Sequence, residues 1–129
     1  MTDPIADMLT RIRNASAVRK SELVLDYSKH KMALATILAE EGYVEKVEHL
    51  TNGPLPAIRI VLKYENAKPF IRSIRRISAP GRRVYVSYRD LPHVLQDLGI
   101  AIVSTPRGLM TNKRARKERL GGELLCELF

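Results

Sequence analysis

Residues 104–117, STPRGLMTNKRARK, contain the residue types in this chain that are best suited to binding an anion. Ser104 and Thr105 carry hydroxyl groups that both donate and accept hydrogen bonds. Gly108 has no side chain, so another molecule can approach the backbone closely. Five basic side chains follow, namely Arg107, Lys113, Arg114, Arg116 and Lys117. No acidic residue occurs in the segment, which predicts a loop that binds the sugars and phosphates of a polyanion.

A second candidate region is VYVSY, residues 84–88. Side chains alternate between the two faces of a strand, so Tyr85 and Ser87 share one face. Arg82 and Arg83 come directly before it. If the valines are buried, the ring of Tyr85 is free to stack on an unpaired base or a ribose. The sequence supports equally the alternative that Tyr85 is a core residue.

Catalytic groups are not evident. His30, His49 and His93 are scattered and have no carboxylate at a metal-ligand spacing, and Ser104 lacks the flanking glycines of a nucleophile elbow. Cys126 is the single cysteine, which excludes an intrachain disulfide. The sequence therefore predicts a protein that is not an enzyme, with no metal, cofactor or small-molecule substrate.

The charge distribution indicates the kind of partner. The 129 residues carry a net charge of +8, and 45% of them are hydrophobic, enough for a folded core. Residues 1–65 contain nine basic and nine acidic side chains, whereas residues 66–129 contain thirteen and five. The second half is therefore expected to face a nucleic acid, with a solvated basic face as the alternative. No apolar run is long enough for a membrane span or a signal peptide, so we expect a cytoplasmic protein without a membrane partner, and an organellar source stays open.

The elements that position these residues form two modules. In the first, residues 3–15 predict a helix with Asp3 as its cap, Pro4 as its first residue and one apolar face. A strand, a helix capped by Ser28 and a hairpin follow, at residues 22–27, 28–42 and 43–64. We place the end of this N-terminal α/β domain near the polar segment ENAKP, giving domains 1–66 and 67–129.

The second module is predicted to be mainly β. The segments 70–78 and 83–88 flank APGR and predict a hairpin. Residues 100–105 show no alternation and predict a strand that is buried on both faces. A short helix capped by Thr111 or Asn112 and a final strand after Gly122 complete an α+β fold of two small modules.

Four segments together resemble the bacterial small-subunit ribosomal protein eight family: DPIADMLTRIRNA at 3–15, GIAIVST at 99–105, GLMT at 108–111 and GGELLC at 121–126. The resemblance runs nearly end to end. It implies a structural constituent of the small ribosomal subunit that binds the central domain of 16S rRNA and helps assemble the platform. It also implies contacts with neighbouring small-subunit proteins, of which the fifth is expected before the twelfth or the second. Feedback binding to the family's own operon mRNA is a further implication.

The resemblance also assigns residues. Ser104, Thr105, Tyr85 and Glu123 match the family's RNA-binding positions, and the N-terminal helix matches a secondary rRNA contact. Pro106 departs from the family's usual serine and removes one hydroxyl and one N–H donor. The full set expected to bind RNA is Arg82, Arg83, Tyr85, Ser87, Ser104, Thr105, Pro106, Arg107, Gly108, Lys113, Lys117, Gly122 and Glu123. The secondary contact is expected to use Thr2, Asp3, Arg11 and Asn14.

Two other functions are consistent with the composition. A nonspecific DNA- or RNA-binding architectural protein would need only the net charge of +8. An RNA-processing enzyme would need catalytic groups that the sequence does not offer. Competition by duplex DNA and a cleavage assay with divalent metal distinguish these functions from specific RNA binding.

Overall fold

The structure is a computed structural model, and it describes residues 3–129. The described chain forms two compact units. The N-terminal unit comprises Pro4–Ile71, and the C-terminal unit comprises Asp3 together with Arg72–Phe129. The division expected near residue 66 coincides with a tight turn inside the N-terminal unit, where Asn66 and Ala67 both have positive φ.

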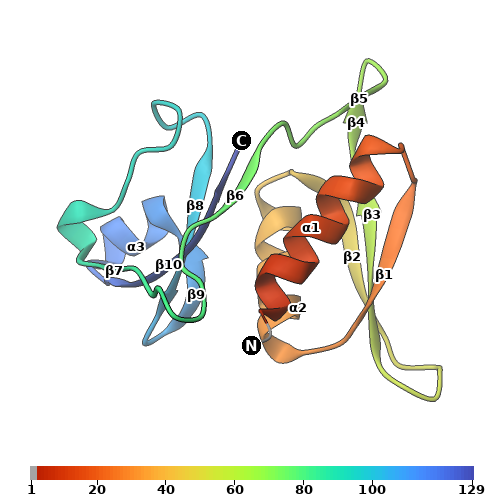
Figure 1. Ribbon diagram of the computed structural model, residues 1–129, viewed down its shortest axis with the longest axis horizontal. Coiled ribbons are helices and arrows are strands. Elements are labelled where there is room, and N and C mark those ends of the chain that lie inside the picture. The colour runs from red at the N-terminus through yellow and green to blue at the C-terminus, as the bar shows by residue number, and fades with distance from the viewer. Residues whose placement is uncertain (1–2) are drawn as a thin grey trace. The chain divides into compact units, whose positions relative to one another are not determined.

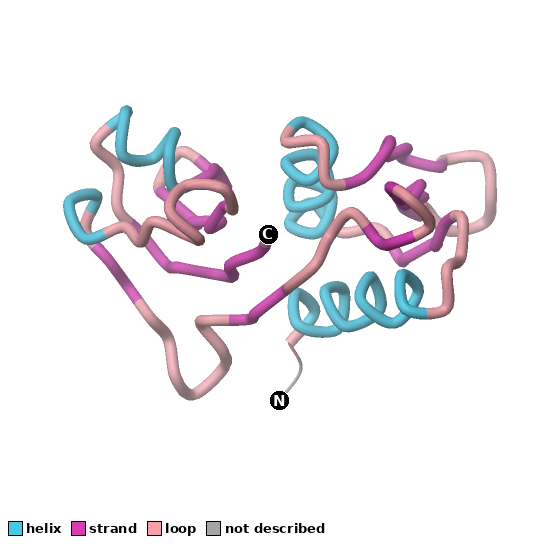
Figure 2. The backbone as a smooth tube through the Cα atoms, turned by 90° about the horizontal axis from the view of Figure 1, so that it is seen from above, coloured by secondary structure: helices cyan, strands magenta, loops and turns pink. Residues whose placement is uncertain are grey.

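The N-terminal unit is a three-stranded antiparallel sheet with two helices, in the strand order β1-β3-β2 (Figure 1). Its elements are α1 (Pro4–Ala17), β1 (Glu22–Asp26), α2 (Lys29–Glu40), β2 (Val44–Leu50), β3 (Ala57–Leu62), β4 (Tyr64–Glu65) and β5 (Lys68–Pro69). α1 packs near β1 and α2 near β2, on the buried face of the sheet (Figure 2). The expected order of helix, strand, helix and hairpin is confirmed.

The two helices begin where their sequences predict. α1 starts at Pro4, and its expected apolar face, made of Ile5, Met8, Leu9 and Ile12, is buried. In α2 the side chain of Ser28 accepts a hydrogen bond from the backbone N–H of Lys31 at 3.1 Å, because a free N–H in the first turn needs such a partner. No helix within residues 3–129 is long and apolar enough to cross a membrane.

The C-terminal unit is built around the last strand. Its elements are β6 (Ile74–Arg76), β7 (Tyr85–Val86), the 3-10 helix η1 (Tyr88–Asp90), β8 (Ile100–Thr105), β9 (Gly108–Thr111), α3 (Asn112–Glu118) and β10 (Gly122–Leu128). The strand order is β6-β10-β8-β9, and β7 also pairs with β10. Its core comprises Leu91, Val94, Ala101, Val103, Met110, Ala115 and Leu124.

The predicted hairpin between residues 70–78 and 83–88 is wrong. β6 and β7 pair with β10, on the edge that β8 does not use, and not with each other. Only an isolated bridge between Ala79 and Arg82 remains of the expected turn. The backbone N–H of Ser78 donates to Leu124 O, and the N–H of Leu124 donates to Val84 O. Pairing with β10 therefore satisfies both flanks of the turn and outweighs the local hairpin.

The segment GLMT forms β9, a strand that the sequence did not predict. It pairs with β8 in register, Thr105 opposite Gly108 and Ser104 opposite Leu109, which leaves Pro106 and Arg107 as a two-residue turn. β8 is almost wholly buried, as its lack of alternation predicted. The cap of α3 is Thr111, whose side chain accepts from the backbone N–H of Arg114.

Candidate nucleic-acid interface

Three of the predicted site residues lie in one line across the C-terminal sheet. Tyr85 on β7 is opposite Glu123 on β10, and Glu123 is opposite Ser104 on β8. Directly paired residues point to the same face of a sheet. The neighbouring pair, Leu124 and Val103, points to the other face and joins the core. We call Tyr85, Glu123 and Ser104 the cross-sheet row; it lies on the face away from that core.

Tyr85 is the exposed end of this row. Its side chain is 70% exposed, while Val84, Val86 and Tyr88 pack against the core. The two possibilities that the sequence left open are therefore resolved, because the valine face is the inner one. Ser87 is also exposed, and its hydroxyl donates to Asp90 at 3.0 Å.

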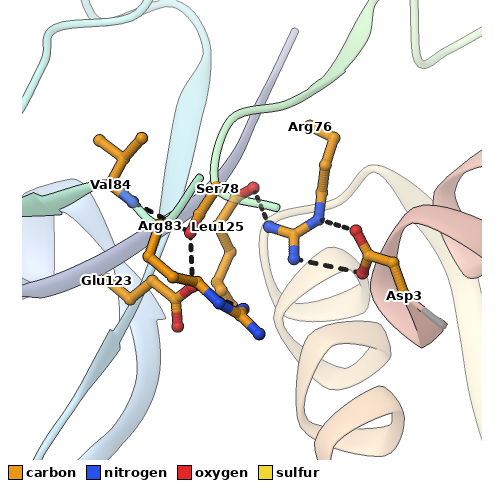
Figure 3. Close-up of polar contacts among 7 residues, drawn as sticks. All are labelled: Asp3, Arg76, Ser78, Arg83, Val84, Glu123 and Leu125. Carbon is orange, nitrogen blue, oxygen red and sulfur yellow. Dashed lines mark hydrogen bonds and ion pairs between the residues drawn. The ribbon is translucent and has the colours of Figure 1, made fainter. Parts of the chain in front are cut away.

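Glu123 ties the row to the loop that carries the arginines, as Figure 3 shows. Its Oε2 accepts hydrogen bonds from Ser78 Oγ at 2.5 Å and from Arg83 Nη1 at 2.9 Å. Ser78 is fully buried, and its hydroxyl also accepts from the backbone N–H of Val84 at 3.1 Å. Glu123, on β10 opposite Tyr85, thus holds Ser78 and Arg83 of the loop that precedes β7.

The environment of Glu123 keeps its carboxyl group charged. Partial burial by itself raises the pKa, but the hydrogen bonds from Ser78 and Arg83, with the charges of Arg83 and Arg76, outweigh it and lower the pKa below the ordinary value. A charged carboxylate is the stronger acceptor for both donors. The hydrogen bonds that hold the loop 78–83 to Glu123 are therefore strongest at neutral pH, where the carboxylate is charged.

The hydroxyl of Thr105 is used inside its own turn. It donates to Gly108 O at 2.8 Å and accepts from the backbone N–H of Arg107 at 3.1 Å. Thr105 is only 9% exposed, whereas Pro106, Arg107 and Gly108 are exposed. Thr105 consequently shapes the turn, and the exposed atoms near it belong to the next three residues.

Gly122 is explained by close packing between strands. A Cβ atom at this position would lie 2.0 Å from Ser104 O, and one at Gly121 would lie 2.5 Å from Val86 O. Only glycine lets β10 come this close to β8 and β7. The expected binding residue Gly122 therefore faces the protein's own backbone and sets the spacing of the cross-sheet row.

The predicted cations lie in two groups. Arg82 and Arg83 are on the loop beside Tyr85. Lys113 and Lys117 are exposed on α3, which packs through Ala115 on the core face of the sheet, away from the row. The turn between β8 and β9 contacts the helix that carries the second group, because Arg107 Nη1 lies 3.8 Å from Glu118 Oε1 at the end of α3.

The expected secondary-contact residues that the structure describes are divided between the two units. Thr2 lies outside the described residues. Asp3 belongs to the C-terminal unit, where its carboxylate accepts from Arg76 Nε at 3.1 Å and Arg76 Nη2 at 3.2 Å (Figure 3). Arg11 and Asn14 belong to the N-terminal unit and line a groove of about 500 Å³ between α1 and β1. Arg11 Nη2 also donates to Val24 O at 3.1 Å.

The groups considered for catalysis show no arrangement that performs it. Cys126 is fully buried, and burial raises its pKa to about 12, so the thiol stays protonated and unreactive. His93 does have a carboxylate partner, contrary to the sequence reading: its Nδ1 lies 2.8 Å from Asp97 Oδ1. Within residues 3–129, no three histidine, cysteine or acidic side chains are placed to hold a metal ion.

Sequence reasoning missed two residues that organise this region, Ser78 and Arg76. Arg76 Nη1 donates to Leu125 O at 2.6 Å while its other nitrogens hold Asp3. Ser78 ends the segment 70–78, which is apolar and basic apart from Ser78 and Ser73, and it stands just before the turn APGR. A polar residue at a position that should be buried is the signal that could have identified it.

Comparison with known proteins identifies the family of this chain. The family described as Ribosomal protein S8 matches residues 3–129. The small ribosomal subunit protein uS8 of Nitrosomonas europaea is 53% identical over 98% of this chain and 96% of its own length. Proteins of the same name from Cupriavidus metallidurans and Clostridium novyi are 52% and 49% identical, over 98% and 100% of this chain and 96% and 98% of their own lengths. The chain therefore belongs to the ribosomal protein S8 family.

Proposed function

We propose that this chain binds rRNA through its C-terminal unit, with the cross-sheet row and the Pro106–Arg107 turn as the contact surface. As a member of the ribosomal protein S8 family, the chain is a structural constituent of the small ribosomal subunit and not an enzyme. The observation that carries the proposal is the cross-sheet row. It places an exposed aromatic ring, a hydroxyl and a fixed arginine loop on adjacent strands.

The row suits irregular RNA better than a regular duplex. The deep major groove of A-form RNA excludes side chains, so specific proteins contact unpaired bases by stacking and by hydrogen bonds to base edges. Tyr85 is 70% exposed and offers a ring for stacking. Ser104 offers a hydroxyl for a base edge or a 2′-hydroxyl, and the strands that carry both residues are rigidly paired through β10.

The exposed cations contribute the part of the affinity that does not depend on the nucleotide sequence of the RNA. Arg82, Lys113 and Lys117 are exposed side chains that reach phosphates. Thr105 acts indirectly, by fixing the backbone of Arg107 through its hydroxyl. Pro106 fits as an exposed turn residue, because the turn needs no N–H donor there and proline presets φ.

The finer assignment follows the family. We propose the central domain of 16S rRNA as the target and assembly of the platform as the role. The proposed neighbours are the fifth small-subunit protein and, after it, the twelfth and second. Binding to the protein's own operon mRNA is proposed to use the same surface, and Arg11 and Asn14 are proposed as a secondary rRNA contact.

Competition binding tests this function. A labelled central-domain rRNA fragment is bound at moderate salt and challenged with equal concentrations of the unlabelled fragment and of duplex DNA. We expect the fragment to displace far better than the DNA, since specific sites typically exceed nonspecific ones by about a thousandfold or more. Equal displacement would establish the nonspecific architectural function instead. Footprinting on whole small-subunit rRNA then locates the site.

A cleavage assay tests the remaining alternative. The same fragment is incubated with the protein and a divalent metal, and its length and modification state are followed over time. We expect an unchanged fragment, because no metal-binding cluster occurs in residues 3–129 and the buried thiol is protonated. Turnover would show that the chain acts on RNA rather than only binding it.

A further inference from the structure

Glu118 is the one acidic residue in the basic stretch that follows the hairpin turn. Residues 104–119 contain six basic side chains, Arg107, Lys113, Arg114, Arg116, Lys117 and Arg119, and this single acid. Its Oε2 accepts from Arg114 Nε at 2.6 Å, and its Oε1 lies 3.8 Å from Arg107 Nη1. One carboxylate therefore serves two arginines, one from the turn and one from α3.

The stability of α3 does not explain this placement. Glu118 is the last residue of α3, where the helix dipole disfavours a negative charge. The pair of Arg114 and Glu118 is spaced i, i+4 with the cation first, which is the weaker of the two orientations. A carboxylate in this position contributes little to the stability of α3, and its main interactions are the ion pairs with the two arginines.

The exposure of the three side chains indicates what the carboxylate does. Arg107 and Arg114 are 73% and 66% exposed, so both guanidinium groups face solvent and any approaching phosphate. Glu118 is only 28% exposed, so its side chain is more shielded from solvent than either arginine. An exposed ion pair is weak, so a phosphate can displace the carboxylate, but it gains less than it would from an arginine that has no anionic partner. The carboxylate thus occupies a site that a phosphate would otherwise take.

We propose that Glu118 is a specificity-determining residue: an internal counter-anion that limits nonspecific phosphate binding by Arg107 and Arg114. Nonspecific complexes depend almost wholly on phosphate contacts, so they lose most from this competition. A specific complex also uses Tyr85 and Ser104, which Glu118 does not contact. The inference rests on the proposed RNA-binding function and adds a residue that sets its selectivity.

Glu118→Gln is the test, with Glu127→Gln as the matched control. Glu127 is also a shielded carboxylate paired with an exposed arginine, Arg75, at 2.8 Å, and both substitutions raise the net charge by one. Affinities of both variants and the wild type for duplex DNA and for the rRNA fragment are measured over a salt series. Thermal unfolding confirms that each variant is folded.

We expect Glu118→Gln to tighten duplex DNA binding by about threefold or more at low salt and to steepen the salt slope by roughly one unit, the effect of one additional phosphate contact. Its affinity for the rRNA fragment should rise less, so the ratio of the two affinities falls. Glu127→Gln should change both affinities by less than about twofold, since screening weakens distant charges.

Two results would overturn the inference. Equal effects of the two variants would mean that only net charge matters. Weaker binding by Glu118→Gln would mean that the carboxylate presents the arginines to RNA rather than occupying them. Failure of the proposed function is recognised separately, because it appears in the wild type as equal affinity for duplex DNA and the rRNA fragment.

Discussion

Thr105 illustrates how a residue can shape the turn of a proposed binding surface through hydrogen bonds within the protein. Its hydroxyl donates to Gly108 O and accepts from the N–H of Arg107, so both hydrogen-bonding functions are used within the turn. Ser104, one residue earlier, lies in the cross-sheet row instead. The two adjacent hydroxyls, which the sequence presents as equivalent, therefore have different roles at the residue scale.

Thr105→Val should reduce both folding stability and RNA affinity. Valine keeps the shape of the side chain but removes the hydroxyl that bonds the Arg107 N–H and Gly108 O. The free energy of unfolding and the free energy of RNA binding should each weaken by about 1–3 kcal/mol. The salt slope of RNA binding should stay nearly unchanged, because no charge is altered. Urea unfolding and fluorescence titration measure the two effects. Thr105→Ser keeps the hydroxyl and should restore most of both; a serine variant as weak as the valine variant would contradict this role.

Glu123 should make the free energy of unfolding depend on pH in the acidic range. Its folded-state pKa lies below the ordinary value of 4.5, so the stabilisation is complete above that value and is lost as the pH falls through the lowered pKa. Wild-type stability should therefore drop more steeply below about pH 4.5 than that of Glu123→Gln. Urea unfolding at several pH values between 3 and 6 gives the two curves, and parallel curves would exclude the contribution.

At the scale of elements, β10 organises the C-terminal unit. It pairs with β8 on one edge and with both β6 and β7 on the other. The glycines at its start permit contact distances that a side chain would block, and the row of Tyr85, Glu123 and Ser104 depends on this spacing. The cross-sheet row, which is the proposed binding surface, is thus a property of strand pairing, and its three residues come from three separate segments.

Gly122→Ala should destabilise the C-terminal unit strongly. The new Cβ would lie 2.0 Å from Ser104 O, and backbone cannot move aside as a flexible side chain can. We expect a loss of about 2–3 kcal/mol, the range of overpacking in a tight site.

Gly108→Ala is the control for this substitution, because its Cβ meets nothing within 4 Å and only its φ of +106° is unfavourable. That strain should cost roughly 1 kcal/mol. Urea unfolding compares the two variants. Because Gly122 has no positive φ, a loss at Gly122 no larger than the loss at Gly108 would mean that β10 can move away from Ser104 O and that strand spacing does not require glycine.

At the scale of the whole molecule, charge and chemistry are divided between segments. The second half of the chain carries the entire net charge of +8, and that half forms the C-terminal unit apart from its first few residues. Within this unit, the cross-sheet row and the cations of α3 lie on different faces of the sheet. General attraction and specific contact are therefore separable by substitution.

Lys117→Ala should reduce the salt slope of RNA binding by roughly 0.7–0.9, the contribution of one phosphate contact. The side chain is exposed on α3 and no ion pair within residues 3–129 involves it, so folding stability should hardly change. Titrations from low to moderate salt provide the slope.

Tyr85→Ala should instead lower RNA affinity about equally at every salt concentration, since stacking involves no counterion release. If Tyr85→Ala changed the salt slope and Lys117→Ala did not, the assignment of stacking to Tyr85 and of phosphate contact to Lys117 would be wrong.

The sequence by itself determined the elements whose signals are local. The helix cap at Ser28, the apolar face of α1 and the buried strand β8 all follow from neighbouring residues, and all are present. For the cap of α3 the sequence left Thr111 and Asn112 open, and the structure selects Thr111. The charge imbalance and the family motifs likewise required no coordinates. The helix caps, the apolar face and the strand can be predicted from sequence because each depends on residues that lie close together along the chain.

Only the tertiary structure decided which residues act together. Nothing local distinguishes a hairpin of residues 70–88 from two strands that each pair with β10, because the paired residues of β10 lie 36 to 54 positions away in sequence. The same pairing exposed Tyr85, turned Glu123 toward Ser78 and Arg83, and set Gly122 against Ser104 O. Long-range strand register therefore determined the site, while the sequence alone determined its parts.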